Sequence, residues 1–417
     1  MRFNIIFILF YVILGLIVDT ALWLLHPKAA RKTWKIPYFT FCGLCYALLT
    51  VGLALPWRNV GIAITPKMWI LYIWLSIYVI KISMVIWGLI GLIPRLWKGK
   101  RITLGLYIGF PIGLICFATM WWGVWGGRRQ IETVEIDVVS QRLPESFNGF
   151  SIAQISDLHL GSWGEDTSFV SKLVDSINSR HPDLIVFTGD IVNRDASEMK
   201  PFLSVLQRLK APYGVFSIMG NHDYGSYGNW NTQNDSLANE NTVRELQAKM
   251  GWRMLRNEHI SLHQGNDSVI IIGVENWGEP PFKSYGDFRR ALTHSVDSGK
   301  ALAPYGPEFK VLLSHNPEHW RLRVRNESNT DLTLSGHTHA MQAELRLGNF
   351  RWSPSVWRYP AWGGLYATTD DGKTQPLLYV NVGAGEVGLP FRIGATPEIT
   401  IITLSRKGVP SRPRYVR

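Results

Sequence analysis

Residues 150–159 read FSIAQISDLH, a short apolar run that ends in the polar cluster Asp157-Leu-His159. Four later stretches of the chain have the same form, an apolar run closed by Asp, Asn or His. Val, Ile and Phe are frequent in the first four of the five runs, as they are in strands buried inside a sheet. The sequence therefore predicts strands at Phe150–Ser156, Leu184–Thr188, Val215–Met219, Lys310–Leu313 and Leu332–Ser335.

The segments between these runs include helical patterns. In Ser168–Asn178 the apolar residues share one helical face, namely Phe169, Leu173, Val174 and Ile177. Alternation of strand and helix predicts an α/β fold in which sheets lie between helices. Functional sites of open α/β sheets lie at the carboxyl ends of the strands, so we expect the five polar clusters to meet at one common edge.

The clusters are rich in side chains that bind divalent cations. Two cations roughly 4 Å apart can aim a deprotonated water at phosphorus and neutralise the charge on the phosphoryl oxygens, and carboxylates and imidazoles can hold them. The five clusters are Asp157-Leu158-His159, Gly189-Asp190, Gly220-Asn221-His222-Asp223, Ser314-His315 and Gly336-His337-Thr338-His339.

Each cluster taken alone also has an ordinary structural explanation. An Asp-x-His is commonly a helix cap or a surface pair. Asn221 and Asp223 are typical turn residues, and His315, which precedes Asn316-Pro317, is a candidate helix cap. Five independent turns would have no reason to share His and Asp, so the joint pattern favours a metal site.

In this order the clusters resemble the calcineurin-like metallophosphoesterases, whose pattern reads D-x-H, G-D, G-N-H-D/E, a lone His and G-H-x-H. The resemblance covers residues 152–404, about three fifths of the chain. Four later stretches are similar to the tail of the membrane-associated, YkuE/YaeI-like branch of that superfamily. They are Gly363–Tyr366, Asn381–Gly385, Pro390–Arg392 and Pro397–Ile399.

The resemblance implies an α/β/β/α sandwich and a role for each cluster residue. One metal would be held by Asp157, His159 and His339, and the second by Asn221, His315 and His337. Asp190 would bridge the two metals, and a hydroxide between them would attack phosphorus. His222 would protonate the leaving group, while Asp223 would orient that imidazole or shape the mouth of the site. A ligand set without thiolate suits Mn, Fe, Zn, Ni or Co.

The first third of the chain has a different character. Four apolar segments are long enough to cross a bilayer, at residues 4–25, 36–56, 68–93 and 104–125. We therefore predict a four-helix transmembrane region over residues 1–129. Residues 130–147 would form a linker and a first strand, and residues 148–417 the metallophosphoesterase domain.

Charge separates the two parts in the same way. Residues 1–129 contain fourteen Lys and Arg but one acid, Asp19, whereas the remainder carries twenty-nine basic and thirty-one acidic residues. Nucleic-acid binding by the second part is therefore not expected. The first predicted loop holds Lys28, Arg31, Lys32 and Lys35, the third holds Arg95, Lys98, Lys100 and Arg101, and the second only Arg58 and Lys67. The positive-inside rule then places loops one and three in the cytoplasm and the catalytic domain on the extracytoplasmic face.

Two charged residues, Asp19 and Lys81, interrupt the apolar helices. An unpaired charge at that depth is costly, so a salt bridge between them is one hypothesis. The competing interpretation is that Lys81 reaches an interface while Asp19 lies near a helix end.

Two stretches are candidates for contact with substrate. The polar segment Tyr224–Asn241, with Tyr227 and Trp230, has the composition of a loop beside an active site or of an unstructured surface loop. A group of aromatic residues favours contact with lipid headgroups or acyl chains, or else core packing. It comprises Trp352, Trp357, Tyr359, Trp362 and Tyr366.

These observations favour a membrane-anchored, dinuclear metal-dependent phosphohydrolase that cleaves a phosphate ester or pyrophosphate. An active site near a bilayer meets lipid phosphates at high effective concentration, so a lipid-linked or membrane-proximal substrate is expected, with membrane lipids as partners. The alternatives are a phosphodiesterase for soluble nucleotides and a non-catalytic membrane scaffold that keeps the fold.

Overall fold

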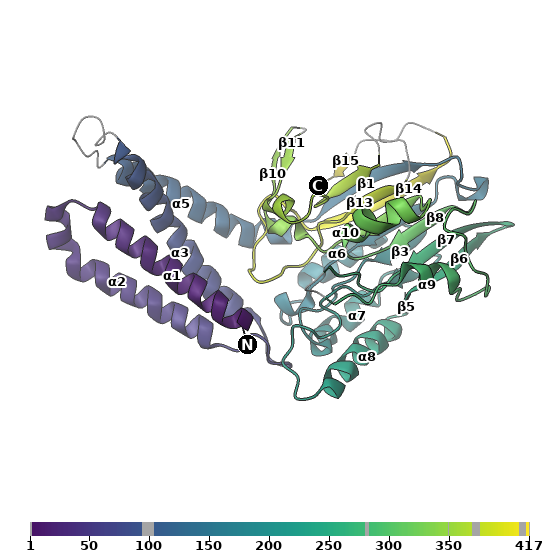
Figure 1. The fold of residues 1–417 in the computed structure, drawn as a ribbon, viewed down its shortest axis with the longest axis horizontal. Helices are drawn as coiled ribbons and strands as arrows, with labels where there is room; N and C mark the ends of the chain where they lie inside the picture. The colour runs from purple at the N-terminus through teal and green to yellow at the C-terminus, as the bar shows by residue number, and fades with distance from the viewer. Residues whose placement is uncertain are drawn as a thin grey trace. The chain divides into compact units, whose positions relative to one another are not determined.

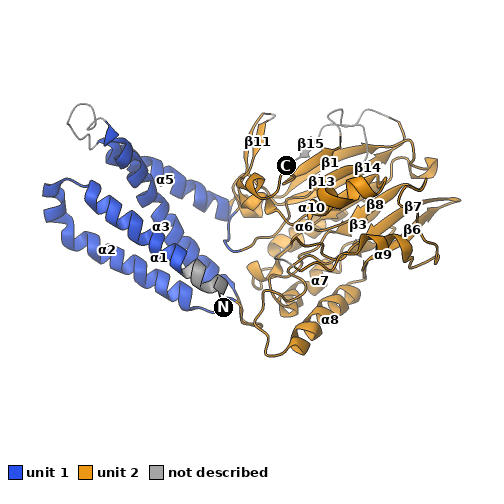
Figure 2. Ribbon diagram, in the orientation of Figure 1, with its two compact units in different colours: residues 1–57, 64–125, 388–391 blue, residues 58–63, 126–387, 392–417 orange. Residues whose placement is uncertain are grey.

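The computed structural model describes residues 2–93, 104–279, 283–348, 350–368, 376–407 and 414–416. The chain forms two compact units (Figure 2). Unit 1 comprises residues 1–57, 64–125 and 388–391, and unit 2 comprises residues 58–63, 126–387 and 392–417. Residues 58–63 thus belong to unit 2, although the residues on both sides of them in the sequence belong to unit 1. Residues 388–391 belong to unit 1, although their sequence neighbours belong to unit 2.

Unit 1 contains four long helices among the described residues. They are α1 (Arg2–Leu25), α2 (Lys28–Ala54), α3 (Thr65–Ile90) and α5 (Leu104–Trp125). Of the described part of the chain, three helices are long and apolar enough to cross a membrane, and α1 adds the shorter apolar stretch Leu9–Leu25. Because these helices are apolar all round, large side chains such as Ile17 and Tyr107 remain exposed on their outer faces.

Helix α2 begins earlier than the sequence predicts. The expected span was 36–56, but the helix starts at Lys28 and continues through Pro37. Its first turns carry Lys28, Arg31 and Lys32, which are good helix formers, so only the short link at Pro27 separates α1 from α2. The cations expected in loop three, from Arg95 to Arg101, lie outside the described residues.

Of the two alternatives for Asp19 and Lys81, the structure shows the salt bridge. Lys81 Nζ lies 2.8 Å from Asp19 Oδ1, and the hydroxyl of Tyr78 donates to Asp19 Oδ2 at 2.7 Å. Both charged residues are buried among the helices of unit 1. Each charge therefore has a partner, which lowers the cost of holding it away from water.

Unit 2 contains two large sheets (Figure 1). The seven-stranded sheet has the order β15 (Arg414–Val416), β1 (Glu132–Val139), β14 (Glu398–Ser405), β2 (Ser151–Ile155), β3 (Leu184–Phe187), β4 (Val215–Ser217) and β5 (Trp252–Met254). The six-stranded sheet has the order β12 (Gly364–Ala367), β13 (Leu377–Val380), β9 (Leu332–Ser335), β8 (Lys310–Leu313), β7 (Asp267–Gly273) and β6 (Glu258–Gln264). A separate hairpin consists of β10 (Leu345–Leu347) and β11 (Phe350–Trp352).

The two sheets pack face to face. Their shared core contains Ile152 and Leu184 from the first sheet together with Val311 and Leu332 from the second. Helices cover the outer faces: α6 (Ser168–Asn178) and α8 (Gln233–Lys249) contribute to one outer core, and α9 (Phe288–Thr293) to the other. The α/β fold with mixed sheets between helices is thus confirmed, and α6 has the predicted bounds.

The five predicted strands exist, but they do not share one sheet. β2, β3 and β4 are parallel neighbours in the seven-stranded sheet, whereas β8 and β9 are parallel neighbours in the other. The expectation of one common edge is therefore wrong. Polar clusters follow the carboxyl ends of strands in both sheets, and these two edges of the sheets meet. Gln154 Nε2 joins them by donating to Ser335 O at 2.9 Å.

Candidate metal centre

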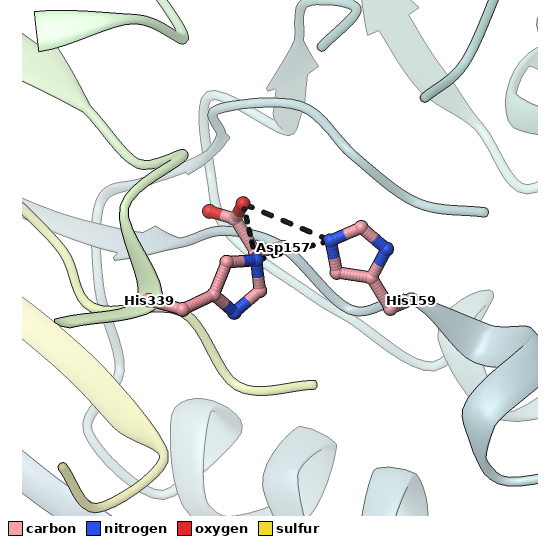
Figure 3. A group of neighbouring side chains, drawn as sticks. All are labelled: Asp157, His159 and His339. Carbon is pink, nitrogen blue, oxygen red and sulfur yellow. Dashed lines mark hydrogen bonds and ion pairs between the residues drawn. The ribbon is translucent and has the colours of Figure 1, made fainter. Parts of the chain in front are cut away.

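The first group of candidate ligands consists of Asp157, His159 and His339. Asp157 and His159 follow β2, and His339 follows β9, so the group draws on both sheets. His339 Nε2 lies 3.2 Å from Asp157 Oδ1 and 3.1 Å from His159 Nε2. Figure 3 shows the carboxylate and the two imidazoles turned toward one another.

The second group consists of His315, His337 and Asn221, which follow β8, β9 and β4. His315 Nε2 lies 3.2 Å from His337 Nδ1 and 3.2 Å from the amide oxygen of Asn221. His337 thus faces the group with Nδ1, and its Nε2 pairs with the hydroxyl of Tyr359 at 2.8 Å.

Asp190, after β3, lies between the two groups. Its Oδ2 is 3.5 Å from Nε2 of His159 in the first group and 3.2 Å from Nε2 of His315 in the second. Asp190 is almost completely buried. The structure therefore brings all seven sequence-predicted ligands into one continuous cluster, with Asp190 at its middle.

The donor atoms of this cluster suit divalent cations. Ring nitrogens and carboxylate oxygens face one another at 3.1–3.5 Å, although neutral ring nitrogens and carboxylates cannot all satisfy one another with hydrogen bonds. A cation among them would accept all of these lone pairs at once. Imidazole, carboxylate and amide oxygen without thiolate are ligands of Mn, Fe, Zn, Ni and Co.

The electrostatics of the cluster favour positive charge. Burial by itself would raise the pKa of the Asp190 carboxyl, but the imidazoles of His315 and His222 hold it well below its usual value. Burial and the neighbouring His222 lower the pKa of His159, and burial and His315 lower the pKa of His337 to about 3. An ionised carboxylate beside neutral imidazoles is the protonation state that metal binding requires.

The raised pKa of His315 is a second indication that the cluster attracts positive charge. Burial opposes protonation of its ring, yet the adjacent carboxylate of Asp190 raises its pKa to about 9. A proton on His315 therefore supplies the positive charge that Asp190 attracts. His315 Nδ1 donates to Thr188 O at 2.8 Å, which leaves Nε2 directed toward Asp190.

The backbone is strained at the ligands. Positive φ angles occur at five of the seven, which are Asp157 (54°), His159 (42°), Asp190 (61°), His337 (74°) and His339 (51°). Such conformations cost free energy in residues other than Gly and concentrate at functional sites. Close approach adds a further constraint at Gly336, where a Cβ atom would lie 2.0 Å from Ser156 Oγ and 2.2 Å from Asp157 Oδ2.

His222 lies beside the cluster, next to Asn221. Its ring is perpendicular to that of His159, with centroids 4.8 Å apart. Its Nδ1 bonds to the backbone oxygen of Asn193 at 2.7 Å, and because a carbonyl can only accept, Nδ1 carries the proton. The remaining nitrogen, Nε2, is then the one available for proton transfer.

Asp223 contacts backbone N–H groups, and its predicted role in shaping the mouth of the site stays a prediction. The bond to Asn193 O, and not a bond to Asp223, orients His222 through Nδ1. The Asp223 carboxylate is fully buried and accepts from backbone N–H groups of two strand-end turns. The donors are Asp190, Gly220, Ile191 and Val192, at 2.8, 2.8, 2.9 and 3.3 Å. Asp223 thus fixes the backbone that presents Asp190.

The polar segment Tyr224–Asn241 is a loop only in its first half. Helix α8 begins at Gln233, because Thr232 and Asp235 form a capping box. The remaining loop does border the cluster. Tyr227 stacks on His222 with ring centroids 4.0 Å apart and an interplanar angle of 11°, and its hydroxyl accepts from Asn221 Nδ2 at 3.0 Å.

The aromatic group over residues 352–366 contains both buried and exposed side chains, so neither core packing nor lipid contact describes all of it. Trp362 is buried in a small core with Ala340 and Val382, as core packing predicts. Trp357 is 79% exposed. Tyr359 lies at the cluster through its bond to His337.

Sequence reasoning missed two residues that serve the site. Asn193 holds His222 through a backbone oxygen, which leaves no mark on residue type. Arg392 was noted only as part of a resembling stretch. It is fully buried, bonds to Gly385 O and Ala395 O, and lies 3.3 Å from Nδ1 of His339. In the sequence, an Arg within the Gly- and Pro-rich stretch 383–397 is a signal that could have drawn attention to it.

This fold and this cluster define a metal-dependent phosphoester hydrolase. A family model described as calcineurin-like phosphoesterase matches residues 150–341. The uncharacterized metallophosphoesterase YkuE of Bacillus subtilis is 32% identical over 281 residues, which are 66% of this chain and 85% of YkuE. The chain therefore belongs to the calcineurin-like phosphoesterase family.

Two further relatives extend over more of the chain. A zebrafish (Danio rerio) protein named transmembrane protein with metallophosphoesterase domain is 26% identical over 344 residues, 80% of this chain and 72% of the relative. The UDP-2,3-diacylglucosamine pyrophosphatase LpxG of Chlamydia muridarum is 27% identical over 348 residues, 71% of this chain and 98% of the relative. Together with the apolar helices of unit 1, the first of these indicates a membrane protein.

Proposed function

We propose that the protein is a membrane-anchored phosphohydrolase with two divalent cations, acting on a phosphate ester or pyrophosphate of a lipid-linked or membrane-proximal substrate. The observation that carries the proposal is the position of Asp190, whose Oδ2 reaches an imidazole of each ligand group. One carboxylate between two groups of candidate ligands is the arrangement expected for a bridged pair of cations.

Each group of residues has a distinct task in the proposed reaction. Asp157, His159 and His339 hold one cation, Asn221, His315 and His337 hold the other, and Asp190 bridges them. When bound, the cations would lower the pKa of a water and neutralise charge that develops on the phosphoryl group. His222, whose Nδ1–H donates to Asn193 O, would act in its doubly protonated form and give the proton on Nε2 to the departing oxygen.

A lipid-linked substrate is supported by exposed apolar side chains that follow the ligand His339 closely in the sequence. The β10–β11 hairpin begins six residues after His339 and projects from unit 2 (Figure 1). It exposes Leu347 and Phe350, and Trp357 follows on the next turn. Exposed apolar side chains in one segment suit contact with acyl chains or the bilayer surface. The name of the Chlamydia relative describes a pyrophosphatase for a diacylated substrate.

We further propose that the four apolar helices all cross the membrane and that unit 2 lies on the extracytoplasmic face. The support is the charge distribution: Lys28, Arg31 and Lys32 lie at the α1–α2 end of the bundle, and the sequence between α3 and α5 is also cationic. Protease added to intact cells would then cleave within unit 2. Cleavage only after the cells are opened would place the catalytic domain in the cytoplasm.

The proposed activity is tested with purified full-length protein and an aryl phosphate ester in the presence of Mn²⁺. We expect turnover that chelation removes and Mn²⁺ restores. Asp190→Asn should abolish turnover, because the bridging charge is lost. Asp137→Asn, on strand β1 and outside the cluster, is the matched control and should retain activity. Metal-independent turnover, or an active Asp190→Asn variant, would contradict the proposal.

A further inference from the structure

The short segment 58–63 lies between α2 and α3 in sequence, yet it belongs to unit 2 (Figure 2). The sequence marked it only as a loop with few cations. In the structure, its backbone and the half-buried side chain of Arg58 bond to two segments that carry site residues. Those segments follow β3 and β4, at residues 193–195 and 226–229.

Arg58 makes the first set of contacts. Its Nε donates to Tyr227 O at 3.1 Å, and its Nη2 donates to Ser226 O at 3.0 Å. The backbone N–H of Asn229 donates in return to Arg58 O at 2.6 Å. An isolated parallel β-bridge pairs Asn59 with Asn229. The segment is therefore paired along the loop that presents Tyr227.

The second set of contacts involves the turn after β3. Arg194, which is buried, donates from Nη1 to Asn59 O at 2.8 Å and also bonds to Ile62 O. The backbone N–H of Gly61 donates to Asp195 Oδ2 at 3.2 Å. Segment 58–63 thus connects the turn that contains Asn193 with the loop that contains Tyr227.

Asn193 and Tyr227 fix the same imidazole from different directions. Asn193 O holds Nδ1 of His222, and the Tyr227 ring stacks on the His222 ring. Tyr227 also accepts from the amide nitrogen of Asn221, which leaves the Asn221 oxygen directed toward His315. A displaced Tyr227 would therefore disturb a proposed ligand and the proposed acid together.

We propose that segment 58–63 is a structural wall of the active site, and that Arg58 is a positioning residue that acts on His222 and Asn221 through Tyr227. The role in catalysis rests on the proposed function, whereas the seating of the segment on unit 2 does not. If the segment is seated there, the α2–α3 connection and the catalytic domain lie on the same side of the membrane.

The chemistry of the contact favours Arg at position 58. A guanidinium presents several donors in a planar fork, so it can reach the carbonyl oxygens of Ser226 and Tyr227 together. An ammonium group is a compact donor on a flexible stem, so Lys would restore the charge but not the paired geometry. We therefore expect Arg58→Lys to recover only part of the effect of losing Arg58.

The seating of the segment is tested first, by a disulfide that needs no catalytic activity. In the full-length protein, Asn59→Cys combined with Asn229→Cys should form a cross-link under mild oxidation, because the two residues are bridge partners and Asn229 Nδ2 donates to Asn59 Oδ1 at 3.5 Å. Mass spectrometry identifies the linked peptides, so the native cysteines can stay. The control pair is Asn59→Cys with Ser298→Cys, which should not link. Absence of the first cross-link in folded protein would overturn the proposal.

The positioning role is tested with Arg58→Gln and two substrates that differ in leaving group. A good aryl leaving group departs without a proton, whereas an alkyl alcohol needs one. We expect kcat for the alkyl phosphate to fall on the order of tenfold, part of the 10²–10⁴-fold that acid catalysis typically contributes, while kcat for the aryl phosphate changes little. Arg289→Gln, on the surface of α9, is the control.

Three outcomes separate the possibilities. Unchanged kcat for both substrates, or an equal loss for both, would overturn the positioning role of Arg58. A cross-link in the variant that carries Asn59→Cys and Asn229→Cys, together with no turnover by the wild-type protein, would leave the segment in place but refute the proposed function. A leaving-group-dependent loss together with the cross-link supports both.

Discussion

The carboxylate of Asp223 accepts a hydrogen bond of 2.8 Å from the backbone N–H of Asp190, the residue placed between the two ligand groups. The same carboxylate accepts from three more N–H groups of the adjoining turns. Four donors stabilise a buried carboxylate that lies close to a second one. Asp223 thus holds the backbone of Asp190, the proposed bridging ligand.

This relationship predicts the effect of Asp223→Asn. An amide NH₂ would face backbone N–H groups, which leaves buried donors unpaired at a cost of about 1–3 kcal/mol each. We expect a lower midpoint of thermal unfolding and weaker Mn²⁺ binding, measured by titration calorimetry. Asp223→Glu should not restore either. If Asp223→Asn binds Mn²⁺ like the wild type and loses only kcat, then Asp223 acts in the chemistry.

Gly336 offers a steric test of the first ligand group. A Cβ atom at this position would collide with Ser156 and with the carboxylate of Asp157, so Gly336→Ala should displace Asp157. We expect loss of one bound cation, measured as metal content, and loss of turnover. Gly43→Ala in helix α2 is the control, because a Cβ atom there meets nothing within 4 Å. An active Gly336→Ala variant would show that Asp157 is not a ligand.

Glu198 predicts a pH dependence of stability outside the metal cluster. Burial raises its pKa from 4.5 to about 7, although it accepts from Asn193 N and lies 3.4 Å from Arg194 Nε. Between these two pH values the folded state holds a proton that the unfolded state releases, so stability falls as pH rises. The unfolding midpoint of the wild type, relative to Glu198→Gln, should therefore decrease from pH 5 to pH 7. A constant difference would contradict the raised pKa.

The exposed hairpin predicts a difference between substrates. Leu347→Ser with Phe350→Ser should lower kcat/KM for a lipid phosphate in vesicles by several-fold, because each change removes apolar contact area. Turnover of a soluble aryl phosphate should stay the same, since the hairpin contributes none of the proposed ligands. Arg351 and Arg346 pair with the buried Glu344, so the hairpin should keep its shape. Equal loss on both substrates would exclude a lipid-contacting role.

The local parts of the structure could be predicted from the sequence. Short runs such as Lys310–Leu313 and Leu332–Ser335 are buried strands with the predicted bounds, because apolar runs of that length must leave water. The candidate ligands could be found because each follows such a strand. Their residue types would serve no purpose in unrelated turns.

The arrangement of these parts could not be predicted. Nothing in a strand's own residues states that β3 and β8 belong to different sheets, since pairing is decided by the whole core. The four backbone donors to Asp223 come from two separate turns, so they could not be found from the residue type of Asp223. Backbone contacts such as that of Asn193 O with His222, or of Asn59 O with Arg194, are independent of side-chain type. For this reason the contacts of segment 58–63 with unit 2 could not be predicted from the sequence.

Metal stoichiometry, measured together with turnover, shows whether Asp190 joins two cation sites. Metal-free full-length protein is titrated with Mn²⁺ while bound metal and hydrolysis of an aryl phosphate are followed. We expect two ions per chain, with turnover that appears as the second ion is bound, and loss of both features in Asp190→Asn. Full turnover with a single bound ion, or two ions bound equally well without the Asp190 carboxylate, would contradict it.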